Sequence, residues 1–415
     1  MASDRMYDLA FQFKTCKLWQ KLADTEMYGV QLTDGEIGYC SVMGMLGEHY
    51  ALGLYPGQSG FASYCFTLSN TMMIGTPDEV EMFSEQDCLQ CSYENRDMLT
   101  DGEVEEVRGY CRRREKTPRG RNAFPQFMKY VPGYYPWHLN SALDEERICE
   151  ALEASIWLSG TLKTHRKEEL GLTELQPDTK KIPLLSRNGN RWGISFIDLP
   201  SRERIWPTPH LENEVLTARV KNMKKKAVWE CGCFYLPAPV QDEEEDDQTI
   251  PYFPLILLNV DRKTGMVLHP VMGKADVPED LVRQQAEGIV ERNICPREIR
   301  AGDDRAYALL EDFCRMTGIR LLRDNSLPAF DEAKESLLRQ MDRDGEWGDE
   351  EDDLAEDELD EEDQLDLDQF VDTLMKMRDE ELKTMPRDMV KMLYEMAEWG
   401  AVPEALVKRL KKLFR

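Results

Sequence analysis

The sequence has few of the residues and motifs on which common enzyme mechanisms depend. It contains only five histidines in 415 residues. It has no Gly-x-Ser-x-Gly motif, which would place a serine nucleophile on a strand-to-helix turn. It also lacks a glycine-rich phosphate-binding loop, because Gly44, Gly47 and Gly53 do not have the required spacing. These absences argue against a serine hydrolase and against a nucleotide-binding protein.

Long apolar runs are also absent. No uninterrupted apolar stretch approaches the roughly 20 residues that a membrane-spanning helix needs. Asp4, Asp8, Lys14 and Lys17 interrupt the N-terminal apolar pattern, so we expect an amphipathic helix there and not a signal sequence. The 11 cysteines are an odd number at irregular spacing, which is typical of reduced intracellular thiols. We therefore expect a cytoplasmic protein.

A surplus of positive charge is absent as well. The net charge is -27, and about 17 acidic residues against one arginine lie in the acidic segment, Asp342–Asp368. The rest of the chain also has a net negative charge, which favours solubility and disfavours non-specific binding to nucleic acid. Two basic clusters, Arg112–Arg121 and Lys221–Lys226, are expected to be solvated or to pair with the acidic segment. Contact with nucleic acid is the less favoured alternative.

The clearest secondary-structure pattern runs from Val277 to Phe330. It predicts a helix over 278–293, a strand over 296–302, a helix over 303–318 and a strand over 319–322. Pro278 suits a first helical turn, Asp303 or Asp304 suits the cap of the second helix, and Gly318 suits its end. Such short connections imply right-handed crossovers and parallel pairing of the strands.

Two further patterns complete the predicted fold. Upstream of Val277, residues 254–260 and 266–269 predict a β-hairpin with a buried central strand, so that an open mixed sheet covered by helices is expected. The rest of the chain alternates between helices and strands, with a long aromatic loop over 117–140. The helices are expected at 6–22, 103–114, 144–158 and 212–223, and the strands at 28–32, 37–42, 49–55, 64–68, 192–199 and 227–236.

These patterns predict an α+β protein with two mixed α/β domains, because a chain of 415 residues is too long for a single core. The predicted order is an N-terminal α+β domain at 1–165, a linker at 166–190, a C-terminal α/β domain at 191–341, a disordered acidic linker at 342–368 and a helical tail at 369–415.

Four acidic residues stand where carboxylates could meet in the second domain. Asp261 follows the central strand, Glu287 lies in the next helix, and Asp303 and Asp324 follow the last two strands. A hairpin, helix, strand, helix and strand with acids at these places resembles the ribonuclease H-like architecture of nucleases and transposases, over about residues 250–330. The resemblance implies clustered carboxylates that hold two Mg²⁺ ions for attack on phosphate. The alternative is that these residues cap helices and turns.

The cysteines offer a second candidate metal site. Cys88 and Cys91 have zinc-knuckle spacing, and Cys231 and Cys233 would point to one face of a strand. A structural zinc site needs four ligands. The residues that could complete a set are Cys111, His138 and Cys149. The alternative, which we favour, is that these cysteines are small buried hydrophobic residues.

Four segments carry a further resemblance. They are Leu89–Asn95, Arg119–Phe127, Pro296–Arg300 and Cys314–Arg320. These segments are similar to those of bacterial two-domain proteins built from domains of unknown function, some relatives of which carry domains named after plasmid or mobile-element passenger genes. The resemblance covers most of residues 20–330, and it implies no established activity, substrate or site residue.

We therefore predict an intracellular binding or scaffold module without catalysis. The alternative is a ribonuclease H-like, Mg²⁺-dependent nuclease or a degenerate relative, associated with mobile elements. No cofactor is expected for the first function, whereas Mg²⁺ is expected for the nuclease and Zn²⁺ for the cysteine site. A protein partner is expected at the C-terminal helices, because methionines such as Met389 and Met396 suit adaptable apolar contacts.

Deletion of residues 342–415 tests the expected partner site directly. We expect the truncated protein to lose bound partners or to change its oligomeric state, because the predicted contact helices are removed. Co-purification and light scattering of the full and truncated chains would measure both. Unchanged partners together with an unchanged oligomeric state would contradict the prediction.

Overall fold

The computed structural model describes residues 2–47, 49–70, 79–118, 120–189, 191–241 and 249–343, and in the C-terminal region only residues 403, 408, 409, 411 and 412. The chain divides into one unit from Met1 to Asp344 and another from Gly345 to Arg415. Almost all of the acidic segment and of the predicted helical tail lies outside the described residues. The predictions for those two segments therefore stay predictions.

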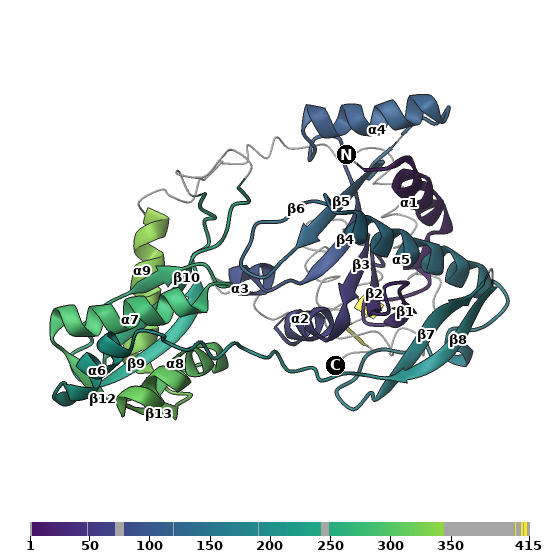
Figure 1. Cartoon of the computed structure of the whole chain (residues 1–415). Coiled ribbons are helices and arrows are strands. Elements are labelled where there is room, and N and C mark those ends of the chain that lie inside the picture. The colour runs from purple at the N-terminus through teal and green to yellow at the C-terminus, as the bar shows by residue number, and fades with distance from the viewer. Residues whose placement is uncertain are drawn as a thin grey trace. The chain divides into compact units, whose positions relative to one another are not determined.

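An eight-stranded sheet forms the N-terminal part of the first unit (Figure 1). Its strand order is β6-β5-β4-β3-β2-β1-β7-β8. Neighbouring strands are antiparallel except for β1 and β7, which are parallel. The strands are β1 (Tyr28–Gln31), β2 (Ile37–Met43), β3 (Tyr50–Pro56), β4 (Cys88–Glu94), β5 (Phe124–Tyr130), β6 (Trp137–His138), β7 (Lys181–Asn188) and β8 (Arg191–Asp198).

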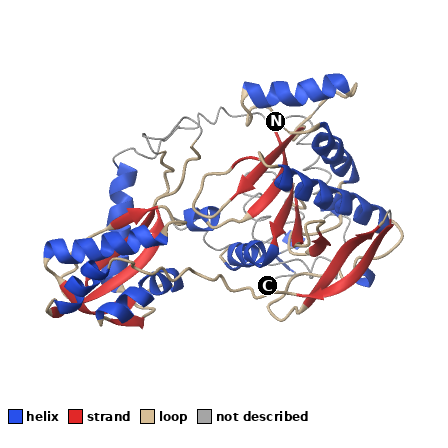
Figure 2. Cartoon of the chain, viewed as in Figure 1, coloured by secondary structure: helices blue, strands red, loops and turns tan. Residues whose placement is uncertain are grey.

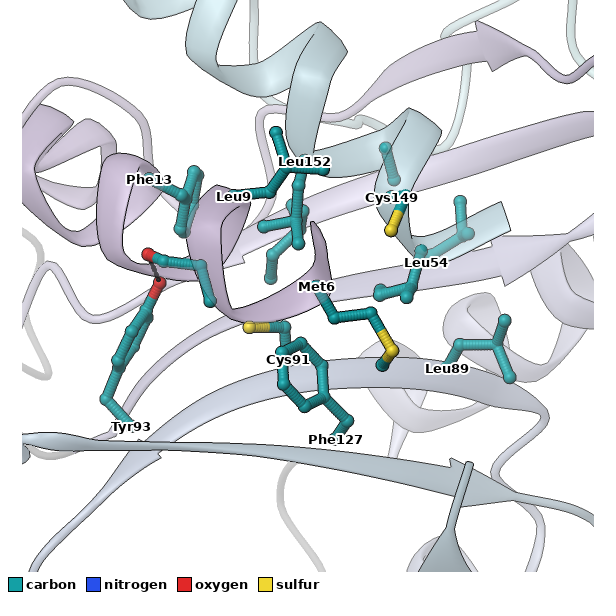
Figure 3. Packing of buried hydrophobic residues seen from close by; sticks show 14 of the residues in the cluster. Met6, Leu9, Phe13, Leu54, Leu89, Cys91, Tyr93, Phe127, Cys149 and Leu152 are labelled. Atoms are coloured by element: carbon teal, nitrogen blue, oxygen red, sulfur yellow. Dashed lines mark hydrogen bonds between the residues drawn. The ribbon is translucent and has the colours of Figure 1, made fainter. Parts of the chain in front are cut away.

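Helices cover both faces of this sheet (Figure 2). On one face α1, α4 and α5 bury a core that includes Phe13, Phe127 and Leu152 (Figure 3). The Tyr93 hydroxyl donates a hydrogen bond of 2.6 Å to the Ala10 carbonyl, which ties β4 to α1 (Figure 3). On the other face α2 packs on β3 and β2. The helices are α1 (Asp4–Cys16), α2 (Gly57–Ser69), α3 (Glu79–Ser84), α4 (Asp101–Arg113) and α5 (Ala142–Thr161).

Helix α2 begins directly after β3, without a loop between them. The sequence analysis predicted a strand at 64–68, and that prediction was wrong because a short apolar run fits a buried helix as well as a strand. The first turn of α2 lies so close to the end of β3 that a Cβ on Gly60 would be 2.6 Å from the carbonyl carbon of Tyr55. Glycine is therefore required at position 60.

Two segments that we expected to be irregular contain strands. The predicted aromatic loop includes β5 and β6, and the predicted linker at 166–190 includes β7. Strand β7 pairs with β1 through Gly29 and Leu184 and through Val30 and Leu185. Such a pairing joins residues that are about 150 positions apart, so no local pattern could have indicated it. Because β8 pairs with β7, the first sheet continues to Asp198. The predicted domain boundaries stay predictions.

A five-stranded sheet follows, with the strand order β11-β10-β9-β12-β13. Strand β10 is antiparallel to both its neighbours, whereas β9, β12 and β13 are parallel. This order is similar to the ribonuclease H-like order that the sequence resembled, with β9, β10 and β11 as three antiparallel strands. The sequence predicted the partner strand of β10 at 266–269, and that position was wrong, because β11 begins at Val271. The strands are β9 (Lys225–Tyr235), β10 (Leu255–Asp261), β11 (Val271–Gly273), β12 (Cys295–Ala301) and β13 (Arg320–Arg323).

Helices cover this sheet on both faces too. Helices α6, α7 and α8 pack on one face and α9 on the other. The predicted helix ends are confirmed, because Pro278 begins α7, Asp303 caps α8 through the Ala306 N–H, and Gly318 ends α8 at a φ of 73°. Among the described residues, no helix is both long and apolar enough to cross a membrane. The helices are α6 (Glu214–Asn222), α7 (Pro278–Arg292), α8 (Asp304–Thr317) and α9 (Pro328–Arg343).

A pair of glycine substitutions tests the close join of β3 and α2. Gly60→Ala should lower the free energy of unfolding by about 1–3 kcal/mol, because the backbone of Tyr55 must move. Gly109→Ala in α4 is the matched control and should raise the free energy of unfolding by up to about 1 kcal/mol, since only the ends of two arginine side chains lie near its Cβ. Urea denaturation of both variants would measure these changes. Equal stability of the two variants would contradict the close packing of the first turn of α2 on the end of β3.

Candidate functional site at the carboxyl edge of the second sheet

A half-open cleft of about 1030 Å³ lies at the carboxyl ends of β9 and β12. Cys233 and Phe234 line it from the end of β9, and residues 303–305 line it from the turn after β12. The carboxyl edge of parallel strands is the usual place for a ligand in open α/β sheets. The N-terminal half contributes the end of α2 and Glu81 of α3, and the connections at 174–177 and 202–206 complete the wall.

The carboxylate of Glu85 binds three side chains beside this cleft. Glu85 directly follows α3 and is 1% exposed. Its Oε1 accepts a hydrogen bond from the Tyr235 hydroxyl at 2.7 Å and forms an ion pair with Arg305 Nη2 at 2.8 Å, and its Oε2 accepts a hydrogen bond from Arg204. Arg204 also donates to the main-chain oxygen of Glu85 at 2.9 Å. This one buried acid therefore joins α3 to β9, to α8 and to the segment before α6.

Arg305 is held in a fixed orientation in the cleft wall. Its guanidinium lies 4.3 Å from the ring centre of Trp206 and 4.8 Å from that of Tyr235. Its Nη2 pairs with Glu81 and Glu85, whereas its Nε and Nη1 are buried and have no hydrogen-bond partner among the described residues. The side chain is only 9% exposed. An unfilled donor on a buried charged group is costly, so such atoms require an explanation.

The protonation states around Arg305 follow from burial and charge. Burial alone would lower the pKa of Arg305, but Glu81 and Glu85 raise it well above its usual value, so the guanidinium stays charged. Burial raises the pKa of Tyr235, and Glu85 adds to that shift, so the hydroxyl remains a donor. Burial and the nearby Asp303 carboxylate raise the pKa of the Cys233 thiol well above its usual value.

The four acids proposed for magnesium binding each have local partners. Asp261 accepts from the main-chain N–H groups of the turn that follows it, and Glu287 pairs with Arg283 on the same helix at 3.0 Å. Asp303 caps α8 and lies in the cleft wall, and Asp324 pairs with Arg300 at 2.6 Å, which lowers the pKa of Asp324. Within the described part of the chain, no three His, Cys, Asp or Glu side chains could together hold a metal ion. A catalytic role for the four acids stays a prediction.

The cysteines proposed for zinc are buried in two different cores. Cys88 and Cys91 are three positions apart on β4 and face opposite sides of the sheet, so that Cys88 joins the α2 core and Cys91 joins the α1–α5 core. Cys231 and Cys233 face the same side of β9, as the sequence indicated. Burial raises the pKa of all four thiols, which favours the protonated form over the thiolate that binds metal.

The basic clusters have partners within the protein. Arg113 pairs with Asp4 at 2.6 Å, and Arg114 pairs with Asp8 at 2.8 Å, so the cations at the end of α4 bind the acids of α1. In the second cluster, the ammonium group of Lys225 donates to the main-chain oxygen of Lys221. These contacts give the first cluster a structural role.

Several residues in or beside the cleft were missed by the sequence analysis. Glu85, Arg204 and Trp206 stand in segments without a distinctive pattern, and Tyr235 lies in the predicted strand at 227–236, where nothing marked it as a site residue. One signal was present, because Asp303 was already predicted to follow a parallel strand, and ligands bind beyond the carboxyl ends of such strands. Arg305, two positions further on, could have been included on that ground.

Substitution of Glu85 tests the buried charge cluster. Glu85→Ala should lower the free energy of unfolding by about 3–5 kcal/mol, because Arg204 loses its carboxylate partner in the interior. Asp280→Ala is the control, since it breaks an exposed pair with Arg283, and it should cost at most about 1 kcal/mol. Denaturant unfolding of both variants is the measurement. A small loss in Glu85→Ala would show that the cluster contributes little.

Comparison with known proteins identifies two domains in the chain. Residues 4–175 match the domain of unknown function DUF7309, and residues 216–338 match the domain of unknown function DUF6930. No curated protein and no solved structure matches the chain. The first match covers most of the eight-stranded sheet and the second covers the five-stranded sheet with its helices. The chain is therefore a protein built from two domains of unknown function, DUF7309 and DUF6930, which together cover most of its length.

Proposed function

We propose that this chain is a binding protein without catalytic activity, and that its ligand lies in the cleft at the carboxyl ends of β9 and β12. The observation that carries the proposal is Arg305, a charged side chain that is buried in the cleft wall while two of its nitrogens lack partners in the part of the chain that the structure describes. The guanidinium lies between the rings of Trp206 and Tyr235. Ligand sites commonly combine apolar walls with a small number of polar groups that have unfilled bonding capacity.

The size and construction of the cleft support the proposal. Its volume of about 1030 Å³ is at the upper end of the range for small-molecule sites. Both halves of the first unit contribute to its wall, since Cys65 and Glu81 come from the N-terminal half and Cys233 and Arg305 from the C-terminal half. Binding sites commonly form where two such halves meet.

The alternative of a magnesium-dependent nuclease has less support from the residues at this edge. Two-metal hydrolysis needs several carboxylates with free oxygens. At the cleft, Asp303 accepts from the main-chain N–H groups of Ala306 and Cys233, so both its oxygens are already bonded. The Arg305 guanidinium next to it would also repel a cation. These residues do not fit a Mg²⁺ ion, although the strand order is ribonuclease H-like.

The predicted protein partner of the C-terminal helices is compatible with this function. Those helices lie almost wholly outside the described residues, so their role stays a prediction. A ligand in the cleft and a partner at the tail would make the chain an adaptor between the two. The cleft can be tested without the tail's partner.

Alkylation of Cys233 tests the proposed site, because its thiol lines the cleft and is partly exposed. Burial raises the pKa of the Cys233 thiol, so that less of the reactive thiolate is present in the native protein. Without a ligand, the native protein should therefore react with N-ethylmaleimide at Cys233 more slowly than the unfolded protein, and its rate should rise with pH. The small-molecule fraction of an extract of the cells that make the protein should slow this reaction further. Peptide mass spectrometry measures the rate.

Cys16 provides the internal control, since it is also partly exposed but lies on α1, outside the cleft. Its alkylation should not change when the small-molecule fraction is added. Unchanged rates at both thiols, or equal slowing of both, would contradict a ligand in the cleft.

A further inference from the structure

The acidic residues of the cleft are already satisfied or stand in solvent. Glu81 pairs with Arg305, and Asp303 accepts from two main-chain N–H groups. Asp304 pairs with Arg323 and is 70% exposed, while Glu174 and Glu203 are exposed at the rim. Solvent screens exposed charges of this kind strongly. The carboxylates therefore leave little unbalanced negative charge inside the cleft.

Arg305 presents unfilled donors in a fixed plane. Two aromatic rings hold its guanidinium from the sides, and the two glutamates occupy only Nη2. The Nε and Nη1 atoms each retain a donor that suits a single oxygen of a carboxylate or a phosphate. These atoms are shielded from solvent. Trp206 covers the guanidinium and belongs to the connection at 199–213, which has no helix or strand. Binding to the Nε and Nη1 donors therefore requires this ring to shift.

Arg202 is a second cation in the cleft that no carboxylate neutralises. Its Nη2 donates to the main-chain oxygens of Gln176 at 2.8 Å and of Thr179 at 3.2 Å. Among the described residues, no acidic side chain lies within ion-pair distance of it. Its charge is felt inside the cleft, since it opposes the effect of burial and lowers the pKa of the Cys65 thiol relative to burial alone. Lys334 of α9 lines the same cleft.

We propose that the ligand of this cleft carries an oxyanion, a carboxylate or a phosphate group, bound by the guanidinium groups of Arg305 and Arg202. The inference rests on the proposed function and specifies the ligand class for the same site. Arginine suits this role because its guanidinium stays charged and carries five N–H donors, which form strong bonds with the oxygens of such groups. The carboxylates of Glu81 and Glu85 keep Arg305 charged and in place, and the arriving oxygens fill the donors that the protein leaves open.

Sodium phosphate and sodium succinate are the probes, each compared with sodium chloride at the same ionic strength. At least one of them should slow the alkylation of Cys233 in a saturable manner and leave that of Cys16 unchanged. A response to phosphate alone identifies a phosphorylated ligand, and a response to succinate alone identifies a carboxylate ligand. Chloride at matched ionic strength should have no such effect.

Variants of Arg202 test the assignment of the residue. Arg202→Gln should weaken the binding of the active probe by about tenfold or more, because a charge-assisted bond is lost. Arg202→Lys keeps the charge but not the fork, and should weaken it less. Arg187→Gln is the matched control, since Arg187 stacks on Trp192 outside the cleft, and it should bind the probe as the unaltered protein does. Thermal unfolding of each variant confirms that it is folded.

The possible outcomes separate this inference from the proposed function. If the cell extract protects Cys233 but neither phosphate nor succinate does, the cleft binds a ligand of another class and the inference is overturned. If neither the extract nor the probes protect it, the proposed function fails as well. Equal loss of binding in Arg202→Gln and Arg187→Gln would show that the effect is general charge screening, which also overturns the assignment.

Discussion

Glu85 keeps its carboxylate in the interior at the point where α3 meets the second sheet, and the surrounding structure depends on its bonds. A tyrosine and an arginine from separate segments donate hydrogen bonds to it, and a second arginine forms an ion pair with it. A buried charge is stable only when it is paired and hydrogen-bonded, so these segments must stay together. The main chain reinforces the junction, because Gly133 N–H donates to the Ser84 oxygen at 2.7 Å and Phe253 N–H donates to the Gly133 oxygen at 2.8 Å.

The same junction shapes the cleft and leaves its donors open. Glu85 and Glu81 bind one nitrogen of Arg305, and the rings of Trp206 and Tyr235 prevent the guanidinium from turning. The protein thus keeps a charged group with unused donors. Such donors lower the stability of the folded state, and proteins commonly retain them where a function requires them. The ribonuclease H-like strand order explains the location, since β9 and β12 end side by side at this edge. The chemistry that we propose for this edge is that of an anion-binding site and not of a carboxylate cluster.

Local sequence patterns predicted the second sheet well and the cleft poorly. The helices α7 and α8 with the strands between and after them could be predicted, because Pro278, Asp303 and Gly318 mark helix ends by local rules. The pairing of β7 with β1 could not, since it joins segments that are distant in sequence. The burial of Glu85 could not be predicted either, because nothing near it in the sequence distinguishes it from a surface acid. Its partners, Arg204, Tyr235 and Arg305, are brought to it only by the complete fold.

A crystal structure of the protein, prepared with the small-molecule fraction of its own cells, would test the central claim most directly. The decisive feature is the electron density next to Nε and Nη1 of Arg305. Our account predicts a ligand in the cleft with an oxygen atom within hydrogen-bond distance of one of these nitrogens. A cleft without a ligand, in which both nitrogens bind only water or protein atoms, would contradict it.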